Sequence, residues 1–421
     1  MISDRKLIFF ILSYDGQKSK TKTAFSAVFF TISGFTNARL YATIRVKKQT
    51  GDETVQFFKS YTSNTLAGSG NQSFFTADPQ KAQKGRVLYR VFAGGTHRYA
   101  FLFSNTVDST FADGSHSHAG LVLDEWRIES LTVGRVKSLP ALAFTDGAEA
   151  DFPVEDRQPV TFGGKMKKTV MPGELFASDG VSMTFAEGEY LCLEMTFAGA
   201  QLPYHEESLL PVYKADGGVW RYDRRMPLPS MVGCDRCVKT RVAFWGDSIT
   251  QGIGTPKNSY RHWNALVADL CGKDNAYWNL GLGYARARDA ASDGAWAFKA
   301  RQNDIAVVCF GVNDLLHEAI EPARLTAYLA STVRFLKKAG AKVILQTVPP
   351  FDYDAATAAV WREVNDRIRG KLSAEADAVF DTVPIFSADG NGPAARCGGH
   401  PDEAGCEVWA KELTKTIRLF L

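Results

Sequence analysis

Residues 242 to 252 read Val-Ala-Phe-Trp-Gly-Asp-Ser-Ile-Thr-Gln-Gly. The apolar run from Val242 to Trp245 leads directly into Gly246-Asp247-Ser248, so the pattern predicts a buried strand with a serine hydroxyl at its carboxyl end. A serine that follows a strand often does no more than cap the next helix. Other parts of the chain must therefore decide whether Ser248 is a cap or a nucleophile.

The region around and after this strand alternates apolar runs with amphipathic segments. That alternation predicts a three-layer α/β domain over residues 236–421, with a parallel sheet and crossover helices. Ligands of such sheets bind at the carboxyl ends of the strands, where Ser248 and Asn313 would both lie. The expected strands are 242–247, 276–282, 304–310, 342–348 and 378–382, and the expected helices are 259–272, 287–301, 322–339, 355–374 and 403–420.

Residues 1–235 have a different texture. Short β-like runs such as 27–32, 40–46 and 190–197 are separated by clusters of Gly, Asn, Asp and Ser. This spacing predicts an all-β sandwich, either one jelly roll with elaborations or two smaller sandwiches. We therefore expect two domains, with the boundary between residues 235 and 236.

Three further blocks follow the Ser248 block in the α/β region. They are Asn279-Leu-Gly-Leu-Gly283, Phe310-Gly-Val-Asn-Asp314 and Gly399-His-Pro401. Together, in this order, the four blocks over roughly residues 240–421 resemble the SGNH (GDSL) hydrolase superfamily. The segment 178–195 also resembles the β-rich region that precedes the hydrolase core in some multidomain carbohydrate esterases.

The resemblance implies an acyl-transfer mechanism. Ser248 would be the nucleophile, His400 the base that takes its proton, and the Asn313 amide a donor to the oxyanion. The family's oxyanion glycine normally stands five positions after the asparagine, where this chain has Tyr284. We choose Gly283 as its replacement and keep Gly281 open.

Asp247 is expected to brace the nucleophile loop rather than to transfer protons. The chain departs from the family three residues before His400, where the family's aspartate is replaced by Cys397. A thiol is a poor acceptor and carries no fixed charge. Three explanations remain open: a Ser-His dyad that uses a backbone carbonyl, a substitute carboxylate from Asp402 or Asp389, or a degraded enzyme. We favour the dyad.

The aromatic residues and His262 receive structural interpretations. Trp245 is expected in the core, and His262 on the face of the first helix after the nucleophile. Core packing is also favoured for a set of three aromatic residues that could alternatively form a sugar-stacking wall. This set is Trp296, Phe351 and Tyr353.

Composition narrows the possible partners. The chain has 421 residues with 49 basic and 46 acidic side chains, a formal net charge of +3, which gives no support for nucleic acid or membrane as a partner. The apolar run 7–12 is far shorter than the ~20 residues that span a bilayer, so we expect a cytoplasmic protein. Seven scattered cysteines indicate free thiols. Cys234 and Cys237 form a Cys-x-x-Cys pair without a second pair, so no structural metal is expected.

These features predict a serine esterase that acts without metal or organic cofactor on a small acyl ester, such as acetyl, of a saccharide. A lipase or thioesterase is the enzymatic alternative. The alternative that is not an enzyme is a carbohydrate-binding protein whose hydrolase domain has lost its catalytic activity. The acyl group, the alcohol and the oligomeric state do not follow from the sequence.

Overall fold

A computed structural model of the chain describes residues 52–108, 119–206, 208–292 and 294–421. Residues 52–421 group into one compact unit. The β-like runs expected at 27–32 and 40–46, and the apolar run 7–12, lie outside the described residues.

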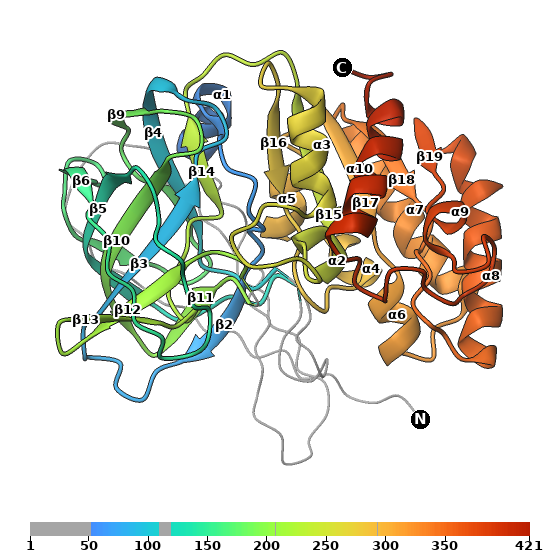
Figure 1. Cartoon of the computed structure of the whole chain (residues 1–421), viewed down its shortest axis with the longest axis horizontal. Helices are drawn as coiled ribbons and strands as arrows, with labels where there is room; N and C mark the ends of the chain where they lie inside the picture. Colours follow the sequence, from blue (N-terminus) through green and yellow to red (C-terminus); the bar gives the residue numbers. More distant parts are fainter. Residues whose placement is uncertain (1–51, 109–118, 207, 293) are drawn as a thin grey trace, which may run out of the picture. The chain divides into compact units, whose positions relative to one another are not determined.

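The strand-rich region consists of antiparallel sheets, shown in blue to green in Figure 1. Strands alternate their side chains between two faces, so Leu191 and Leu193 enter the main core while Cys192 joins a smaller cluster on the opposite face. The predicted β-rich region of antiparallel strands is confirmed over its described residues. One sheet contains β1 (Thr62–Ser63), β14 (Met231–Cys234), β4 (Gly95–Ser104), β8 (Leu175–Ala177) and β9 (Val181–Phe185). The other contains β13 (Val219–Tyr222), β12 (Val212–Asp216), β3 (Gln83–Arg90), β10 (Tyr190–Gly199), β5 (Trp126–Val136), β6 (Glu155–Pro159) and β7 (Lys168–Val170). Outside these sheets lie helix α1 (Asp52–Ser60) and a two-stranded ribbon of β2 (Gln72–Phe75) and β11 (Gln201–Tyr204).

The second region contains the predicted parallel sheet, with strands in the order β16, β15, β17, β18 and β19. All four neighbouring pairs are parallel. Numbered along the chain within this sheet, the order is 2-1-3-4-5, so the direction of strand addition reverses between β15 and β17. Their carboxyl ends form the place where ligands of such sheets bind. The strands are β15 (Arg241–Gly246), β16 (Ala276–Asn279), β17 (Ile305–Cys309), β18 (Lys342–Gln346) and β19 (Ala378–Phe380).

Helices cover both faces of this sheet, which confirms the three-layer prediction (Figure 1). Adjacent residues of β15 point to opposite faces: the Phe244 ring contacts Trp263 of α3, whereas the Trp245 ring contacts Trp296 of α5 and Phe335 of α7. The helices are α2 (Ser248–Gln251), α3 (Trp263–Cys271), α4 (Ala287–Ala290), α5 (Ala295–Ala300), α6 (Val312–His317), α7 (Pro322–Lys338), α8 (Ala355–Arg369), α9 (Val383–Phe386) and α10 (Glu403–Ile417), with a 3₁₀ turn at Leu372–Ala374.

Two predicted helices differ from the observed ones. The helix expected over 259–272 begins only at Trp263, because Tyr260 has a positive φ of 55° that a helix does not permit. The helix expected over 287–301 is divided into α4 and α5. Gly294 is the N-cap of α5, and glycine is a poor residue inside a helix.

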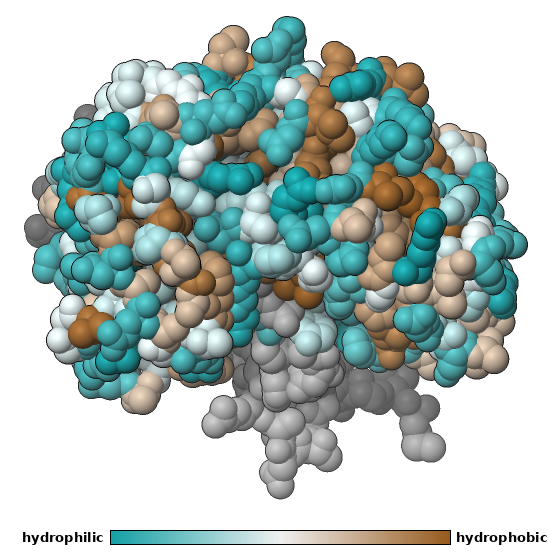
Figure 2. All heavy atoms as spheres, viewed as in Figure 1, coloured by the Kyte–Doolittle hydropathy of each residue, from teal (hydrophilic) through white to brown (hydrophobic). Residues whose placement is uncertain are grey.

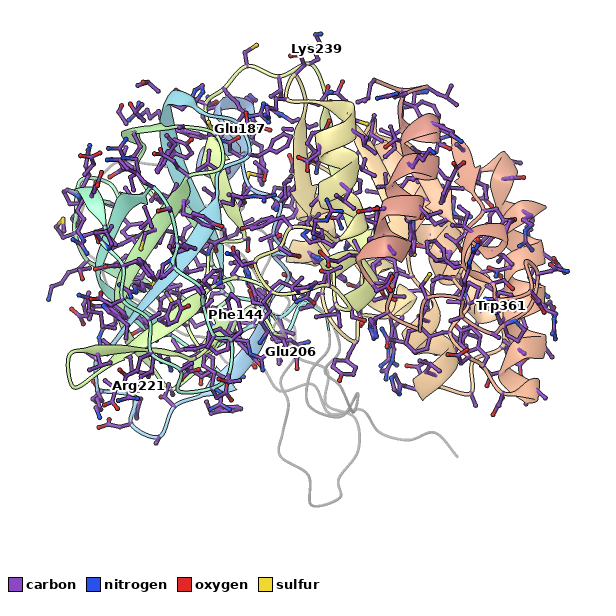
Figure 3. All side chains as sticks on the ribbon, in the orientation of Figure 1. Phe144, Glu187, Glu206, Arg221, Lys239 and Trp361 are labelled. Atoms are coloured by element: carbon purple, nitrogen blue, oxygen red, sulfur yellow. The ribbon has the colours of Figure 1, made fainter. Side chains whose placement is uncertain are left out.

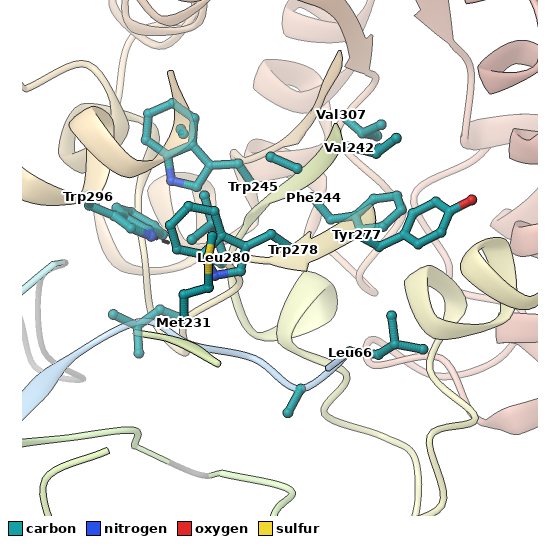
Figure 4. Close-up of a cluster of buried hydrophobic side chains, with 14 of the residues drawn as sticks. Leu66, Met231, Val242, Phe244, Trp245, Tyr277, Trp278, Leu280, Trp296 and Val307 are labelled. Carbon is teal, nitrogen blue, oxygen red and sulfur yellow. Dashed lines mark hydrogen bonds between the residues drawn. The ribbon is translucent and has the colours of Figure 1, made fainter. Parts of the chain in front are cut away.

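The two regions share one apolar core. Leu66 and Met231 of the strand-rich region belong to the same buried cluster as Trp245, Trp278 and Leu280 of the α/β region (Figure 4). The change from antiparallel to parallel sheet falls between β14 and β15. A boundary at residues 235 and 236 therefore stays a proposal about how the chain divides.

The surface is mixed in character. On the face shown in Figure 2, hydrophobic residues are interspersed with hydrophilic ones. None of the helices in the described part of the chain has the length and apolar character needed to pass through a bilayer.

Candidate active site

Ser248 is the first residue of α2, directly after β15. Asp247 is the N-cap, and its Oδ1 accepts a hydrogen bond from the Ile249 N–H at 3.0 Å. Gly246 is required because a Cβ there would overlap the Thr250 side chain. The turn thus places the Ser248 hydroxyl at the carboxyl edge of the sheet, with the first N–H groups of α2 unpaired within the helix.

His400 lies in the loop before α10 and reaches Ser248 from far along the chain. Its Nε2 is 2.7 Å from the Ser248 Oγ, within hydrogen-bond distance. Ser248 is 8% exposed, and His400 is partly buried. Burial lowers the pKa of His400 below its ordinary value of 6.5, so the imidazole is neutral at pH 7 and can accept the serine proton.

Nothing charged orients His400 among the described residues, where the structure gives its Nδ1 no hydrogen-bond partner. The Asp402 carboxylate instead accepts from the Gly405 N–H at 2.8 Å as the N-cap of α10. The Asp389 carboxylate accepts from the Ser387 hydroxyl at 2.6 Å and the Asn391 N–H at 2.9 Å. Both carboxylates proposed as substitutes therefore serve their own loops.

An aromatic ring packs against the imidazole. Phe351 contacts the His400 ring edge to face, with centroids 5.3 Å apart and an interplanar angle of 81°. The same ring packs against Gly399, where a Cβ would lie 2.6 Å from Cζ of Phe351. Cys397 lies beside Gly405, and burial raises the pKa of its thiol, which stays uncharged at neutral pH. Sequence reasoning placed Phe351 in the core and missed this contact.

Asn313 follows β17, next to the strand that leads to Ser248. It lies in the first turn of α6 after Gly311, whose φ of 127° favours glycine. Its side-chain amide donates one hydrogen bond to the Ala285 carbonyl at 3.1 Å, and its second N–H can serve an oxyanion. Asp314 anchors this helix by accepting from the Ala287 N–H at 2.9 Å.

The backbone N–H groups of both candidate oxyanion glycines, Gly281 and Gly283, donate to side chains in this structure. The Gly281 N–H donates to the Asn279 Oδ1 at 2.9 Å, and a Cβ on Gly281 would overlap the backbone of α2. The Gly283 N–H donates to the Gln251 Oε1 at 2.7 Å. Tyr284 has a positive φ of 59°, a backbone conformation that glycine adopts without steric cost. This geometry favours position 284 over Gly283 as the equivalent of the family's oxyanion glycine.

The remaining candidates are structural. His262 is the buried N-cap of α3, not a residue on its face, and burial lowers its pKa to about 4. The Trp296 Nε1 donates to the Leu280 carbonyl at 3.0 Å, and the Tyr353 hydroxyl donates to the Pro349 carbonyl at 3.2 Å. Trp245, Trp296 and Tyr353 are all buried, as core residues are.

Only one group of side chains in the described residues is arranged to hold a metal ion, and it lies in and next to the strand-rich region. It consists of His97, Cys234 and Asp235. Burial raises the pKa of Cys234 to about 11, and the Arg236 guanidinium lies nearby. Cys237 is not part of the group, so the Cys-x-x-Cys pair does not act as two ligands there.

One groove in the described residues is separate from Ser248. It has a volume of about 1040 Å³ and lies in the strand-rich region beside β2, β12 and β13. Its lining includes Phe74, Tyr204 and Lys214, but neither Ser248 nor His400. The candidate catalytic pair therefore lies outside this groove.

Comparison with known proteins identifies the α/β region. Residues 244–408 match the GDSL-like Lipase/Acylhydrolase family. This match assigns the segment to the GDSL-like hydrolases and confirms the predicted class of enzyme, a carboxylic ester hydrolase. No curated protein matches the sequence of the chain.

Solved structures with detectable likeness are distant. A family two carbohydrate esterase from Clostridium thermocellum, in complex with cellohexaose, is 14% identical with a TM-score of 0.38, over 85% of this chain and 98% of that chain. A carbohydrate acetylesterase from Sinorhizobium meliloti is 17% identical with a TM-score of 0.34, over 44% of this chain and 100% of that chain. An inhibitor-bound aryl esterase from M. smegmatis is 17% identical with a TM-score of 0.36, over 44% of this chain and 100% of that chain. Scores of this size carry no argument about the substrate.

Proposed function

We propose that this protein is a serine esterase in which Ser248 attacks an acyl carbonyl and His400 transfers the proton. The observation that carries the proposal is the 2.7 Å contact between Ser248 Oγ and His400 Nε2 at the switch point of the sheet. The amide of Asn313 and the N–H groups of Ser248 and Tyr284 stabilise the oxyanion of the tetrahedral intermediate. His400 then gives the proton to the leaving alcohol, and water repeats the sequence to release the acid.

The substrate class we propose is a small acyl ester, such as acetyl, on a saccharide. A long acyl chain needs a broad apolar surface beside the nucleophile. The large apolar side chains that are well exposed in the described residues include none from the loops 246–254, 280–286 or 393–401. A short acyl group places no such demand on these loops.

The proposal is tested with a panel of p-nitrophenyl esters from acetyl to decanoyl, using wild type and Ser248→Ala. We expect turnover of the short esters by the wild type and loss of turnover in the variant, with unchanged thermal unfolding. A fluorophosphonate probe should label Ser248 and no other serine. Rates that rise with acyl length would favour a lipase or thioesterase. If the wild type neither hydrolyses any ester nor reacts with the probe, the alternative of a carbohydrate-binding protein without catalytic activity is favoured.

A further inference from the structure

Gln251 stands at a junction between the strand-rich region and the loop of residues 280–284, which we call the oxyanion loop. It is the last residue of α2 and is 3% exposed. Its Nε2 donates to the backbone carbonyl of Glu206 at 2.6 Å, and its Oε1 accepts from the Gly283 N–H at 2.7 Å. Glu206 follows β11, and Figure 3 labels it where the two regions meet.

The oxyanion loop has little freedom to move away from Gln251. A Cβ on Gly281 would lie 2.6 Å from the Gln251 Cα, so the loop and α2 are in direct backbone contact. The Gln251 carbonyl also accepts from the Asn279 Nδ2 at 3.4 Å. On the other side, the Leu282 N–H donates to the Gly246 carbonyl at 3.1 Å. The loop is thus bonded to the end of β15 on one side and packed against the end of α2 on the other.

A second contact from the strand-rich region reaches the same loop. The Ser69 hydroxyl donates to the Asn279 carbonyl at 2.7 Å and accepts from the Trp278 Nε1 at 3.0 Å. A Cβ on Gly68 would lie 2.9 Å from the Gln251 Cγ, and a Cβ on Gly70 would lie 2.5 Å from the Leu282 Cβ. Residues 68–70 therefore pack against Gln251, against Leu282 within the loop and against Asn279 directly before it.

We propose that Gln251 is a positioning residue through which the strand-rich region fixes the oxyanion loop. This inference rests on the proposed function, because the loop must hold an oxyanion for its position to affect the rate. A primary amide of this length donates to Glu206 and accepts from Gly283 at every pH, whereas a glutamic acid does so only when it is protonated. The strand-rich region is accordingly part of the catalytic unit, beyond any role in binding the alcohol of the substrate.

The consequence is a specific kinetic effect. Without the amide, the Gly283 N–H and the Glu206 carbonyl lose a buried partner, and the loop can shift. A shift of about 1 Å near the reacting atoms costs on the order of 100-fold in rate. Since the Gln251 side chain is buried and bonded to Glu206 and Gly283, the loss should fall on kcat, with KM near the wild-type value.

Three variants and a control test the inference on p-nitrophenyl acetate. Gln251→Ala and Gln251→Leu remove both hydrogen bonds, and we expect kcat to fall by about 10- to 100-fold with KM within about threefold of wild type. Arg236→Met is the matched control. Arg236 donates to the carbonyls of Lys273 and Asn275 at 2.6 Å each, before the amino end of β16, so its loss should lower stability and leave kcat unchanged.

Gln251→Glu separates positioning from stability, and it remains informative if the other variants fail to fold. A protonated carboxyl can donate to Glu206 and accept from Gly283, as the amide does, whereas a carboxylate can only accept. We expect the ratio of its kcat to that of wild type to rise as pH falls from 8 to 6. A ratio independent of pH, or Gln251 variants that lose only stability, would overturn the inference. Failure of the wild type in the ester panel and the probe labelling would overturn the proposed function, and the inference with it.

Discussion

The nucleophile loop and the loop that carries His400 meet at one hydrogen bond, yet they are held in different ways. Ser248 is fixed within a few residues, by the Asp247 cap and by close packing at Gly246. His400 has no carboxylate partner among the described residues and is held by the ring of Phe351, about 50 residues earlier in the chain. The contrast teaches that the proposed catalytic pair combines one residue positioned by its sequence neighbours with one positioned by packing between distant segments.

The largest effect is expected from His400→Ala. Without a base, the Ser248 hydroxyl keeps its proton, and kcat/KM for p-nitrophenyl acetate should fall by on the order of 10⁴-fold or more. Circular dichroism should show the wild-type melting temperature, because His400 is only partly buried. Activity within tenfold of wild type would mean that His400 is not the base.

Phe351→Ala tests whether packing against Phe351 orients the His400 imidazole in place of the missing carboxylate. We expect kcat to fall by about tenfold, because the imidazole can rotate away from Ser248. Tyr353→Phe is the matched control on the same loop, since it keeps the ring and removes only the hydroxyl bonded to the Pro349 carbonyl. Equal losses in the two variants would show that the loop as a whole, and not the Phe351 ring, supports the base.

The pH dependence of kcat/KM distinguishes a dyad from a triad. A carboxylate partner raises the pKa of a histidine, whereas burial alone lowers it. Burial is the cause found for His400, so the acid limb of the profile should lie below pH 6.5. An acid limb above pH 6.5 would reveal a negative charge that supports the imidazolium.

Asp247 gives the nucleophile loop a pH-dependent stability of unusual sign. Burial raises its pKa to about 7, above the value of 3.8 expected when it is exposed in the unfolded chain. The folded protein then binds more protons between these two values, so the free energy of unfolding should fall as pH rises from about 4 to about 7. Urea unfolding of Asp247→Asn should show a shallower slope over this interval. Asp314, with a pKa that burial also raises to about 7, should preserve the rest of the slope.

The smallest effect is expected at Cys397, the position where the α/β segment departs from the GDSL-like pattern. The thiol lies beside Gly405 and is uncharged, so Cys397→Ala should keep kcat/KM within about twofold of wild type. Cys397→Asp should bring no gain, because the side chain at this position packs beside Gly405 and experiences the negative charge of Asp402. A rise in activity with an acid limb at higher pH would show that the loop can recover a triad.

Much of the fold could be predicted from local pattern. The five strands of the parallel sheet lie within the predicted segments or one residue outside them, because each buried strand reads as a short apolar run. The helix boundaries set by glycine and by positive φ angles were harder to predict from the sequence. The N-cap at Gly294 divides one predicted helix, and the positive φ of Tyr260 delays the beginning of another to Trp263.

The sequence by itself determined the antiparallel β and α/β architecture, the likeness of the α/β segment to the GDSL-like hydrolases and the candidate residues Ser248, Asn313 and His400, because these are carried by periodicity and by short motifs. Only the tertiary structure decided what each candidate contacts. The partners of Gly283 and His400 are Gln251 and Phe351. Neither contact has a signal in sequence spacing, since each joins segments about 30 to 50 residues apart that meet only when the chain packs. Local pattern fixes which groups reach the edge of the sheet, and long-range packing fixes how they are held there.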